Sequence, residues 1–194
     1  MEFILTESEF NEDNTAWNGN RFLMGNGYFG IRGTLEEYTK KQMCAVNMAG
    51  IYDKMGNSWR ESVNAPNPLY TYIKVNGKIY ALPDEKPKFH QQELDFRYGI
   101  HSRVTHWQTE HGNITVVCER FASIARQHNI AMKYTFSVDF DCEAEIITGI
   151  DGDVWDINGP HFVKMKIGSK DGADYVTGMT GEKNISVTVK EYIR

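Results

Sequence analysis

The chain has 194 residues, with 21 basic and 26 acidic side chains and a formal net charge of −5 at pH 7. Hydrophobic residues make up 41% of the chain and charged residues 24%, which is ordinary for a folded domain and excludes a disordered tail or a membrane span. The acidic balance also argues against a nucleic-acid partner, which requires concentrated basic surface. We therefore expect one domain over residues 1–194, with neither a nucleic-acid nor a membrane partner.

Short β-strands make up most of the predicted secondary structure. In chain order, one set of candidate strands covers residues 3–6, 28–32, 43–52, 100–107, 114–123, 162–167 and 175–180. Strands of this length, recurring at intervals of roughly 8–12 residues with turn residues between them, are typical of an antiparallel sandwich. The sequence therefore predicts an all-β fold with a large antiparallel β-sandwich.

Alternation of apolar and polar residues predicts further strands. Every second residue of the segment 130–138 is apolar and faces one way, because successive side chains of a strand point to opposite faces. Residues 144–150 and 185–193 alternate similarly, although Glu191 interrupts the second of these patterns. Between the strand-like strings LYTYIKV and KIYAL, Asn76-Gly77 predicts a two-residue hairpin turn with positive φ at both positions.

Two segments do not show a strand pattern. Residues 34–41 are the best helix candidate, but they lack an apolar stripe and fit a loop equally well. Residues 53–68 contain two of the five prolines together with Gly, Asn and Ser, and this composition predicts one long surface loop.

The three cysteines indicate the cellular compartment. Cys44, Cys118 and Cys142 are far apart, odd in number and form no CxxC pair, as is typical of reduced thiols in a cytoplasm. The N-terminal string MEFILTESEFNED has neither the basic flank nor the apolar centre of a signal peptide. We therefore expect a cytoplasmic protein.

Three of the four glycines near residue 30 match a nucleotide-binding pattern, but only superficially. Gly25, Gly27 and Gly30 satisfy G-x-G-x-x-G, but a dinucleotide site also requires a following helix. The residues after Gly27 continue an extended, aromatic pattern, and Gly33 would interrupt a helix in its first turn. The glycines are interpreted as serving turns or close strand contacts. At least one of the four should therefore have positive φ, or lie where a facing backbone leaves no room for a Cβ atom.

The segment from Asp151 to Gly159 contains the best candidate contact residues. A calcium-binding EF-hand loop would require a ligand at position five and Glu at position twelve, where this chain has Trp155 and Phe162. The segment is therefore interpreted as a polar loop that closes a sheet. Asp151, Asp153 and Trp155 are the candidates for contact with a sugar or with another domain.

Other chemical patterns in the sequence assign no site. His101, His106 and His111 recur every five residues, so neighbouring histidines on a strand would point to opposite faces and could not share a metal. The nucleophile-elbow, Walker and H-E-x-x-H motifs do not occur. We therefore expect no catalytic, metal-binding or cofactor-binding residue in this chain.

A resemblance to a known family rests on several strings in collinear order. Residues 24–37, MGNGYFGIRGTLEE, are similar to the N-terminal signature of glycoside hydrolase family 65. The signature residues of structural interest are Asn26, Gly27, Tyr28, Gly30, Arg32 and Gly33. The resemblance continues through AGIYDK at 49–54, ESVNAPNPL at 61–69, QELDFRYGIHSR at 92–103, ERFASIARQHNIAMKYTF at 119–136 and IITGIDGDVWD at 146–156.

The resemblance implies that the chain is one part of a larger enzyme. In this family such segments form a large N-terminal β-sandwich, or super-sandwich, and a later (α/α)₆ barrel carries the chemistry. Residues 1–194 would be the non-catalytic sandwich domain, supporting the barrel and shaping the mouth of its active site. The parent would perform inverting phosphorolysis of a disaccharide such as maltose, kojibiose or trehalose, with inorganic phosphate as co-substrate, or hydrolysis with water.

The implied partners are the parent's own C-terminal barrel and small saccharides, and a homodimer of the parent is a further expectation. A different class of function, a self-contained carbohydrate-binding module, is favoured by the aromatic content and the loop around Trp155. A complete small hydrolase is a third alternative, but no residues are arranged to supply its acid and base.

Within the signature, Arg32 is expected either to form an internal ion pair with Glu36, Glu37 or an Asp, or to be solvated.

Overall fold

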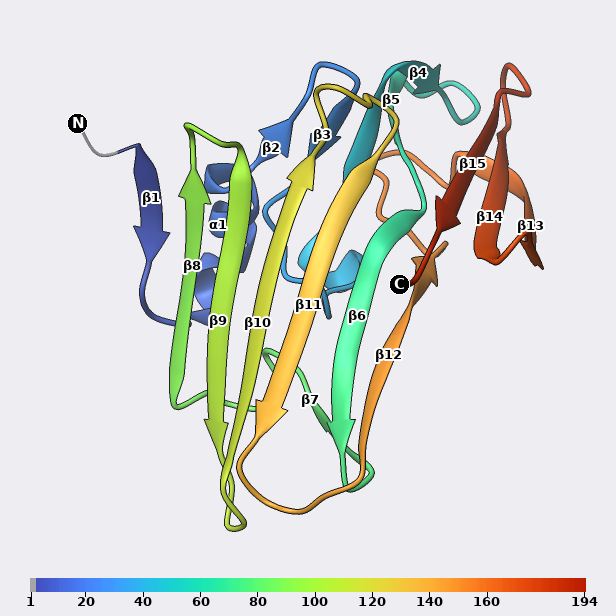
Figure 1. Cartoon of the computed structure of the whole chain (residues 1–194). Helices are drawn as coiled ribbons and strands as arrows, with labels where there is room; N and C mark the ends of the chain where they lie inside the picture. The colour runs from blue at the N-terminus through green and yellow to red at the C-terminus, as the bar shows by residue number, and fades with distance from the viewer. Residues whose placement is uncertain (1–2) are drawn as a thin grey trace.

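The computed structural model describes residues 3–194 and consists mainly of antiparallel strands (Figure 1). In this part of the chain, fifteen strands form four sheets, and one α-helix and two short 3₁₀ helices accompany them. The all-β sandwich predicted from the sequence is confirmed.

The largest sheet has five strands in the order β1-β8-β9-β10-β11. Its members are β1 (Ile4–Glu7), β8 (Phe89–Asp95), β9 (Ile100–Gln108), β10 (Asn113–Ala122) and β11 (Ile130–Val138). Strands β10 and β11 pair in continuous register from Ile114 opposite Val138 to Ala122 opposite Ile130. Side chains on one face of β9 are buried at alternate positions, as the period of a strand requires.

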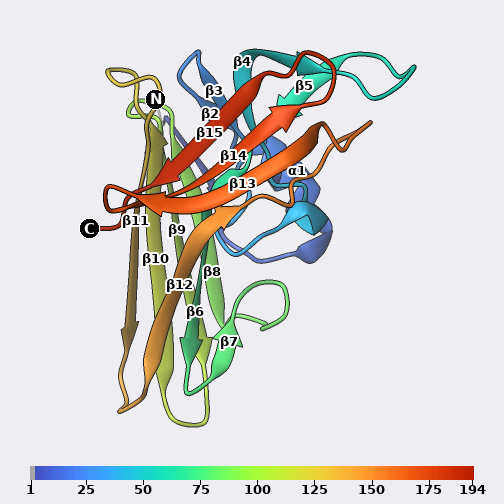
Figure 2. The ribbon, with the colours of Figure 1, turned by 90° about the vertical axis from the view of Figure 1, so that its right-hand side faces the viewer.

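A three-stranded sheet, β12-β6-β7, forms a second layer facing the five-stranded sheet (Figure 2). It contains β6 (Asn67–Val75), β7 (Lys78–Tyr80) and β12 (Ala144–Asp151). Asn76 and Gly77 connect β6 to β7 with φ angles of 50° and 77°, which confirms the predicted hairpin turn. An apolar cluster, which includes Ile73, Trp107 and Val116, fills the space between the two layers.

The other two sheets lie at the end of the sandwich where the chain leaves β12 (Figures 1 and 2). One has the order β2-β3-β4-β5, with β2 (Met24–Gly25), β3 (Phe29–Ile31), β4 (Val46–Asp53) and β5 (Glu61–Asn64). The other has the order β13-β14-β15, with β13 (Phe162–Lys170), β14 (Ala173–Thr180) and β15 (Ser186–Glu191). Strand β13 is an edge strand, and its Val163, Met165 and Ile167 are exposed.

Two local predictions need correction or completion. Residues 53–68 are not one surface loop, because β5 lies within them and its Glu61 and Asn64 are buried. These polar residues are satisfied by partners inside the protein, so their polarity does not indicate exposure. Residues 34–41 are a loop that ends in the 3₁₀ helix Lys40–Gln42, and the short helix α1 (Thr15–Arg21) was not predicted.

The signature glycines behave as predicted. Gly27 has a φ of +86°, and a Cβ on Gly33 would lie 2.3 Å from the Phe22 Cβ and 2.6 Å from the Phe22 carbonyl carbon. A Cβ on Gly25 would lie 2.6 Å from the Phe29 carbonyl oxygen, whereas a Cβ on Gly30 would meet no atom within 4 Å. Close backbone approach therefore explains two of these glycines and a turn explains a third.

Two other signature residues anchor the first part of the chain to the β10–β11 turn. Asn26 Oδ1 accepts hydrogen bonds from the N–H groups of Tyr28 and Phe29, and Asn26 Nδ2 donates to the Ser123 carbonyl at 2.7 Å. The Tyr28 ring lies 4.3 Å from the ring of His128, centre to centre. These contacts give the string NGY a structural role.

The two glutamates at the end of the signature belong to a buried ion-pair network with arginines of β9 and β10. Arg103 Nε lies 3.0 Å from Glu36 Oε2, and Arg103 Nη1 donates to Glu37 Oε1 at 2.7 Å. Arg120 Nη1 donates to Glu36 Oε1 at 2.7 Å. The four side chains are at most 1% exposed, and two cations balance two anions, which offsets the large cost of burying charge.

The ion pair predicted for Arg32 is wrong. Its guanidinium donates instead to the carbonyl oxygens of Ala16 at 2.6 Å and Met43 at 2.9 Å. Glu36 and Glu37 are already held by the arginines of the five-stranded sheet. Arg32 therefore ties helix α1 to the loop before β4.

Candidate functional site at the loop between β12 and β13

The loop formed by residues 152–161, called here the 152–161 loop, connects β12 to β13 and contains most of the predicted contact residues. Asp151 ends β12, and its Oδ1 accepts the Asp153 backbone N–H at 2.9 Å. Asp153 is exposed and forms an ion pair with Lys40 at 2.7 Å. Trp155 is half-buried, and its carbonyl oxygen accepts a hydrogen bond from Asn64 Nδ2 at 2.9 Å.

An open groove lies beside the first part of this loop. It has a volume of about 480 Å³, and it is lined by Thr39, Lys40, Lys41, Tyr70, residues 147–151 and Asp153. Asp151 and Asp153 thus border one groove, whereas Trp155 is not part of its lining. The structure brings together two of the three predicted contact residues.

A buried charged cluster under the other end of the loop was missed by the sequence analysis. His161 Nδ1 lies 3.2 Å from Asp53 Oδ2, and His161 Nε2 lies 2.6 Å from Glu61 Oε1. Asp53 and Glu61 are direct partners in the β4–β5 ladder, where two facing carboxylates repel each other. A histidine that carries a proton on both nitrogens relieves this repulsion by donating to both carboxylates.

The cluster also fixes the backbone of neighbouring segments. Glu61 Oε1 accepts the N–H groups of Ile157 and Asn158, at 3.1 Å and 2.8 Å, while Asp53 Oδ1 accepts the Glu182 N–H at 2.9 Å. Four separate stretches of chain therefore meet at one histidine and two carboxylates. No spacing in the sequence could reveal this, because His161 lies 108 and 100 residues from its two partners.

The pKa values follow from these contacts. Burial alone would raise the pKa of Glu61, but hydrogen bonds from Asn158 and His161 outweigh it and lower that pKa overall. Burial opposes the charge on His161, yet the hydrogen bond to Glu61 and the nearby Asp156 carboxylate raise its pKa. Burial raises the pKa of Asp156. The geometry therefore favours the charged form of His161, between two carboxylates.

We tested whether this cluster fits a metal ion. Glu61, Asp156 and His161 each offer one ligand atom, and these atoms lie within 4.8 Å of one another. A metal, however, requires an unprotonated imidazole nitrogen. Both nitrogens of His161 face carboxylate oxygens at hydrogen-bond distance, and its pKa is raised. The donor set fits an ion pair better than a metal centre.

The same contacts determine what the buried carboxylates can do chemically. A glycosidic general acid must hold a proton and reach the leaving-group oxygen. The side chain of Glu61 is only 8% exposed, and both its oxygens accept hydrogen bonds from the protein. The carboxylates of Glu36 and Glu37 are paired with arginines inside the sandwich. These three groups therefore serve the fold.

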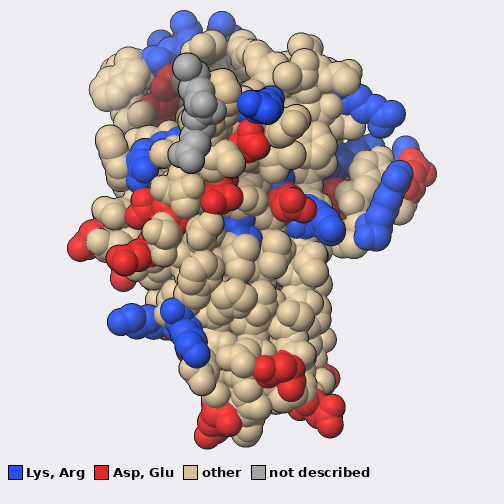
Figure 3. All heavy atoms as spheres, turned by 60° about the vertical axis from the view of Figure 1, so that its left-hand side comes forward, with Lys and Arg blue, Asp and Glu red and all other residues tan. Residues whose placement is uncertain are grey.

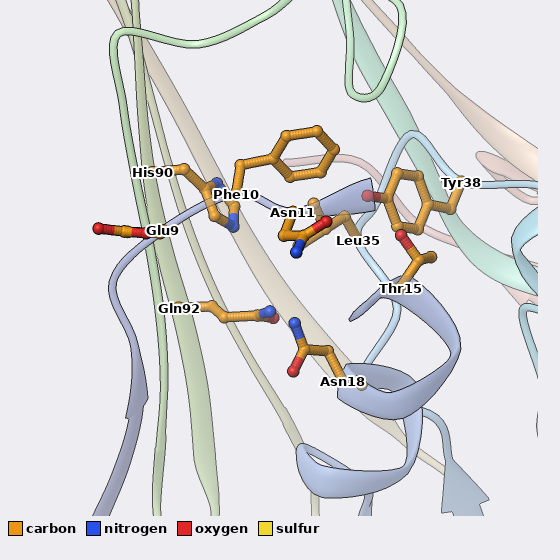
Figure 4. A pocket seen from close by; sticks show the side chains of 10 residues that line it. Glu9, Phe10, Asn11, Thr15, Asn18, Leu35, Tyr38, His90 and Gln92 are labelled. Carbon is orange, nitrogen blue, oxygen red and sulfur yellow. The ribbon is translucent and has the colours of Figure 1, made fainter. Parts of the chain in front are cut away.

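A second hollow lies between helix α1 and strand β8 (Figure 4). Its lining includes Asn18, Gln92 and His90, and the side chains of Asn18 and Gln92 point toward each other. Its volume of about 10 Å³ is roughly that of one water-sized probe. This hollow is too small for a sugar.

The remaining predictions concern the histidines and the surface. His101 is fully buried on the inner face of β9, while His106 lies on the opposite face, as the spacing predicts.

Basic and acidic side chains are interspersed on the face shown in Figure 3, and no continuous basic surface forms there. Among residues 3–194, no helix is long and apolar enough to cross a membrane.

Comparison with known proteins identifies the family. The model of the glycosyl hydrolase family 65 N-terminal domain matches residues 5–192. The chain belongs to this family. The expected resemblance is therefore confirmed over nearly the whole chain.

Relatives of this family 65 N-terminal domain are phosphorylases. It is 51% identical to nigerose phosphorylase of Lachnoclostridium phytofermentans over 86% of this chain and 22% of that protein. It is 37% identical to 1,2-alpha-glucosylglycerol phosphorylase of Bacillus selenitireducens over 89% of this chain and 23% of that protein. The chain spans about a quarter of the length of these relatives.

The fold of the family 65 N-terminal domain is also found in a solved structure. A protein of the human microbiome, named provisionally as a kojibiose phosphorylase, matches with a TM-score of 0.86 and 20% identity. The match covers 96% of this chain and 26% of that one. At this identity the match shows a shared fold.

Proposed function

We propose that this chain is the non-catalytic N-terminal domain of a disaccharide phosphorylase that acts on α-glucosides. The observation that carries the proposal is the alignment of nearly the whole chain with only about a quarter of several phosphorylases. The engagement of Glu36, Glu37 and Glu61 in internal contacts supports it, because a glycosidic acid must be free to meet its substrate. Inorganic phosphate is the co-substrate of the whole enzyme in this proposal.

In this role the domain supports a catalytic barrel and shapes one wall of its active-site mouth. The 152–161 loop suits such a contact, since its base is held by the His161 cluster while Asp153 is exposed. The barrel of the same polypeptide is the proposed partner, with small saccharides as substrates of the whole enzyme and a homodimer as its assembly. We assign this enzyme to the cytoplasm because Cys44, Cys118 and Cys142 are free thiols.

A domain exchange tests the proposal. The residues of nigerose phosphorylase that match this chain would be replaced by residues 5–192, and release of glucose 1-phosphate from nigerose would be measured. We expect activity within about tenfold of the parent enzyme, a barrier change of roughly 1.4 kcal/mol, and no release by the isolated chain. A parallel exchange with the corresponding part of kojibiose phosphorylase of Halothermothrix orenii, 32% identical to this chain, controls for disruption at the junction.

Two results would overturn the proposal. Turnover of a disaccharide by the isolated chain, with phosphate or water, would show that the domain is itself an enzyme. A folded but inactive exchange protein, beside an active control exchange, would show that this chain cannot support a phosphorylase barrel.

A further inference from the structure

The groove beside the 152–161 loop contains an unfilled space beside Tyr70. Tyr70 of β6 lies directly opposite Gly149 of β12 in the ladder, and side chains of facing residues project from the same face of a sheet. Gly149 has no side chain, and a Cβ built there would meet no atom within 4 Å. The space beside Tyr70 that a side chain at residue 149 would occupy is therefore open.

The charges around this groove cancel. Lys40 and Lys41 lie on one side, and Asp151 and Asp153 lie at the end of β12 and just after it. Lys40 and Asp153 form an ion pair with each other. Two positive and two negative groups leave no net charge that would favour an anion or a cation, so a neutral ligand with many polar groups fits best.

The lining groups match the chemistry of a neutral sugar. The Tyr70 side chain presents an apolar ring face and a hydroxyl group. These suit the C–H face and the hydroxyl groups of a pyranose. Carboxylates accept hydrogen bonds from sugar hydroxyls, while lysine donates to sugar oxygens. The volume of about 480 Å³ lies within the range of roughly 300–1,000 Å³ that is usual for small-ligand sites.

We propose that the groove formed by Tyr70, Gly149, Lys41 and Asp151 is a binding subsite for a neutral saccharide. Tyr70 supplies the aromatic face, Gly149 the space beside it, and Lys41 and Asp151 the polar contacts. The inference rests on the proposed function only for the choice of α-glucosides as probes. Of the three contact residues expected from the sequence, Asp151 and Asp153 line this groove and Trp155 does not.

The test is a titration of the isotopically labelled chain with nigerose, kojibiose and maltose, followed by amide NMR shifts. We expect saturable binding with a dissociation constant of about 1–10 mM and shifts centred on residues 147–151. Glucose 1-phosphate, which adds two negative charges to a similar ring, should bind at least about fivefold more weakly, a difference of roughly 1 kcal/mol.

Two matched glycine variants decide whether the ligand occupies the groove. Gly149→Val fills the space beside Tyr70, and we expect binding to weaken by more than about tenfold, a loss of roughly 1.4 kcal/mol. Gly30→Val also adds a side chain to a strand glycine whose Cβ position is open, but Gly30 does not line the groove, so this variant should bind like the parent. Tyr70→Leu, which keeps an apolar group but removes the ring, should weaken binding similarly to Gly149→Val.

The proposal is overturned if the folded chain shows no saturable shifts up to about 50 mM saccharide. It is also overturned if Gly149→Val and Gly30→Val bind equally well, or if glucose 1-phosphate binds more tightly than the neutral sugars. None of these results bears on phosphorolysis by the exchanged enzyme, so failure of this subsite is distinguishable from failure of the proposed function.

Discussion

The surroundings of three buried histidines shift their pKa values in opposite directions. Burial and the neighbouring Arg103 lower the pKa of His90 to about 4. Burial and the two arginines of the ion-pair network lower the pKa of His101 as well. By contrast, carboxylates around His161 raise its pKa. The surroundings therefore disfavour the charged form of His90 and His101 and favour that of His161.

The lowered pKa of His90 predicts a loss of stability in acid. Because the unfolded chain takes up a proton near pH 6.5 and the folded chain only near pH 4, stability is full above about pH 6.5 and falls as the pH drops towards about 4. The loss from His90 is about 3 kcal/mol, given about 1.4 kcal/mol per pKa unit. Urea unfolding of the parent and of His90→Gln from pH 7 to 4 measures it, and equal slopes for both would contradict it.

The raised pKa of His161 predicts the opposite dependence. Its contribution is fully present below the pKa of the unfolded state and is lost as the pH rises through the higher folded-state pKa. We expect His161→Gln to lack this alkaline loss and to be less stable by about 3–5 kcal/mol at neutral pH, since it leaves two buried carboxylates without a cation. Denaturant unfolding between pH 6 and 9 measures both effects.

His111→Gln is the matched control for this experiment, because the His111 side chain is 63% exposed and its loss leaves no buried charge. Its stability should equal that of the parent throughout the pH range. A His161→Gln protein with the parent's stability and pH dependence would refute the role assigned to the buried cluster.

At the scale of secondary-structure elements, close backbone packing between helix α1 and strand β3 depends on Gly33. A Cβ there would overlap the Phe22 side chain and backbone. We expect Gly33→Ala to destabilise the chain by at least about 3 kcal/mol or to prevent folding, because the backbone has to shift to make room. Thermal unfolding measures the effect.

Gly30→Ala provides the comparison, since its Cβ would meet no atom within 4 Å. It should change stability by less than about 1 kcal/mol. If Gly33→Ala proved as stable as Gly30→Ala, the close approach of Phe22 would not explain the glycine.

The sequence predicts the regular strands well because their burial follows a simple period. Strand β11 was found from its alternating apolar residues, and its side chains are in fact half-buried and exposed in turn. Strand β5 was missed because Glu61 and Asn64 are buried through specific polar partners. Local composition does not reveal those partners, which lie far away in the sequence.

The same limit explains the wrong prediction for Arg32 and the incomplete prediction of the site. Glu37 pairs with an arginine 66 residues away, and Glu36 with one 84 residues away. The groove likewise depends on Tyr70 lying opposite Gly149. Asp151 and Asp153 could be named as candidates because they lie close together in the sequence, whereas a cross-strand pair requires knowledge of the register.

At the scale of the whole molecule, the edge strand β13 presents apolar side chains to solvent. Val163, Met165 and Ile167 are 57%, 44% and 77% exposed, and Met165 and Ile167 lie at alternate positions on one face of this edge strand. Exposed apolar edges favour association with other chains. We expect the isolated chain to self-associate with rising concentration and Ile167→Lys to reduce this, as measured by sedimentation velocity.

Ile124→Lys is the control, because Ile124 is 79% exposed but lies outside the strands. It adds the same charge without changing the edge of the sheet. Equal reduction by both substitutions would show that added charge is responsible, not the edge of β13.

The ladder between β1 and β8 also determines how long β1 stays unpaired during translation. Ile4 pairs with Asp95, and Glu7 pairs with Gln92, so β1 has no partner in the sheet until β8 has emerged from the ribosome. Such non-local pairing slows folding, because a long loop must close before any contact stabilises it. The backbone hydrogen-bonding groups of β1 therefore stay unpaired while more than eighty further residues are synthesised.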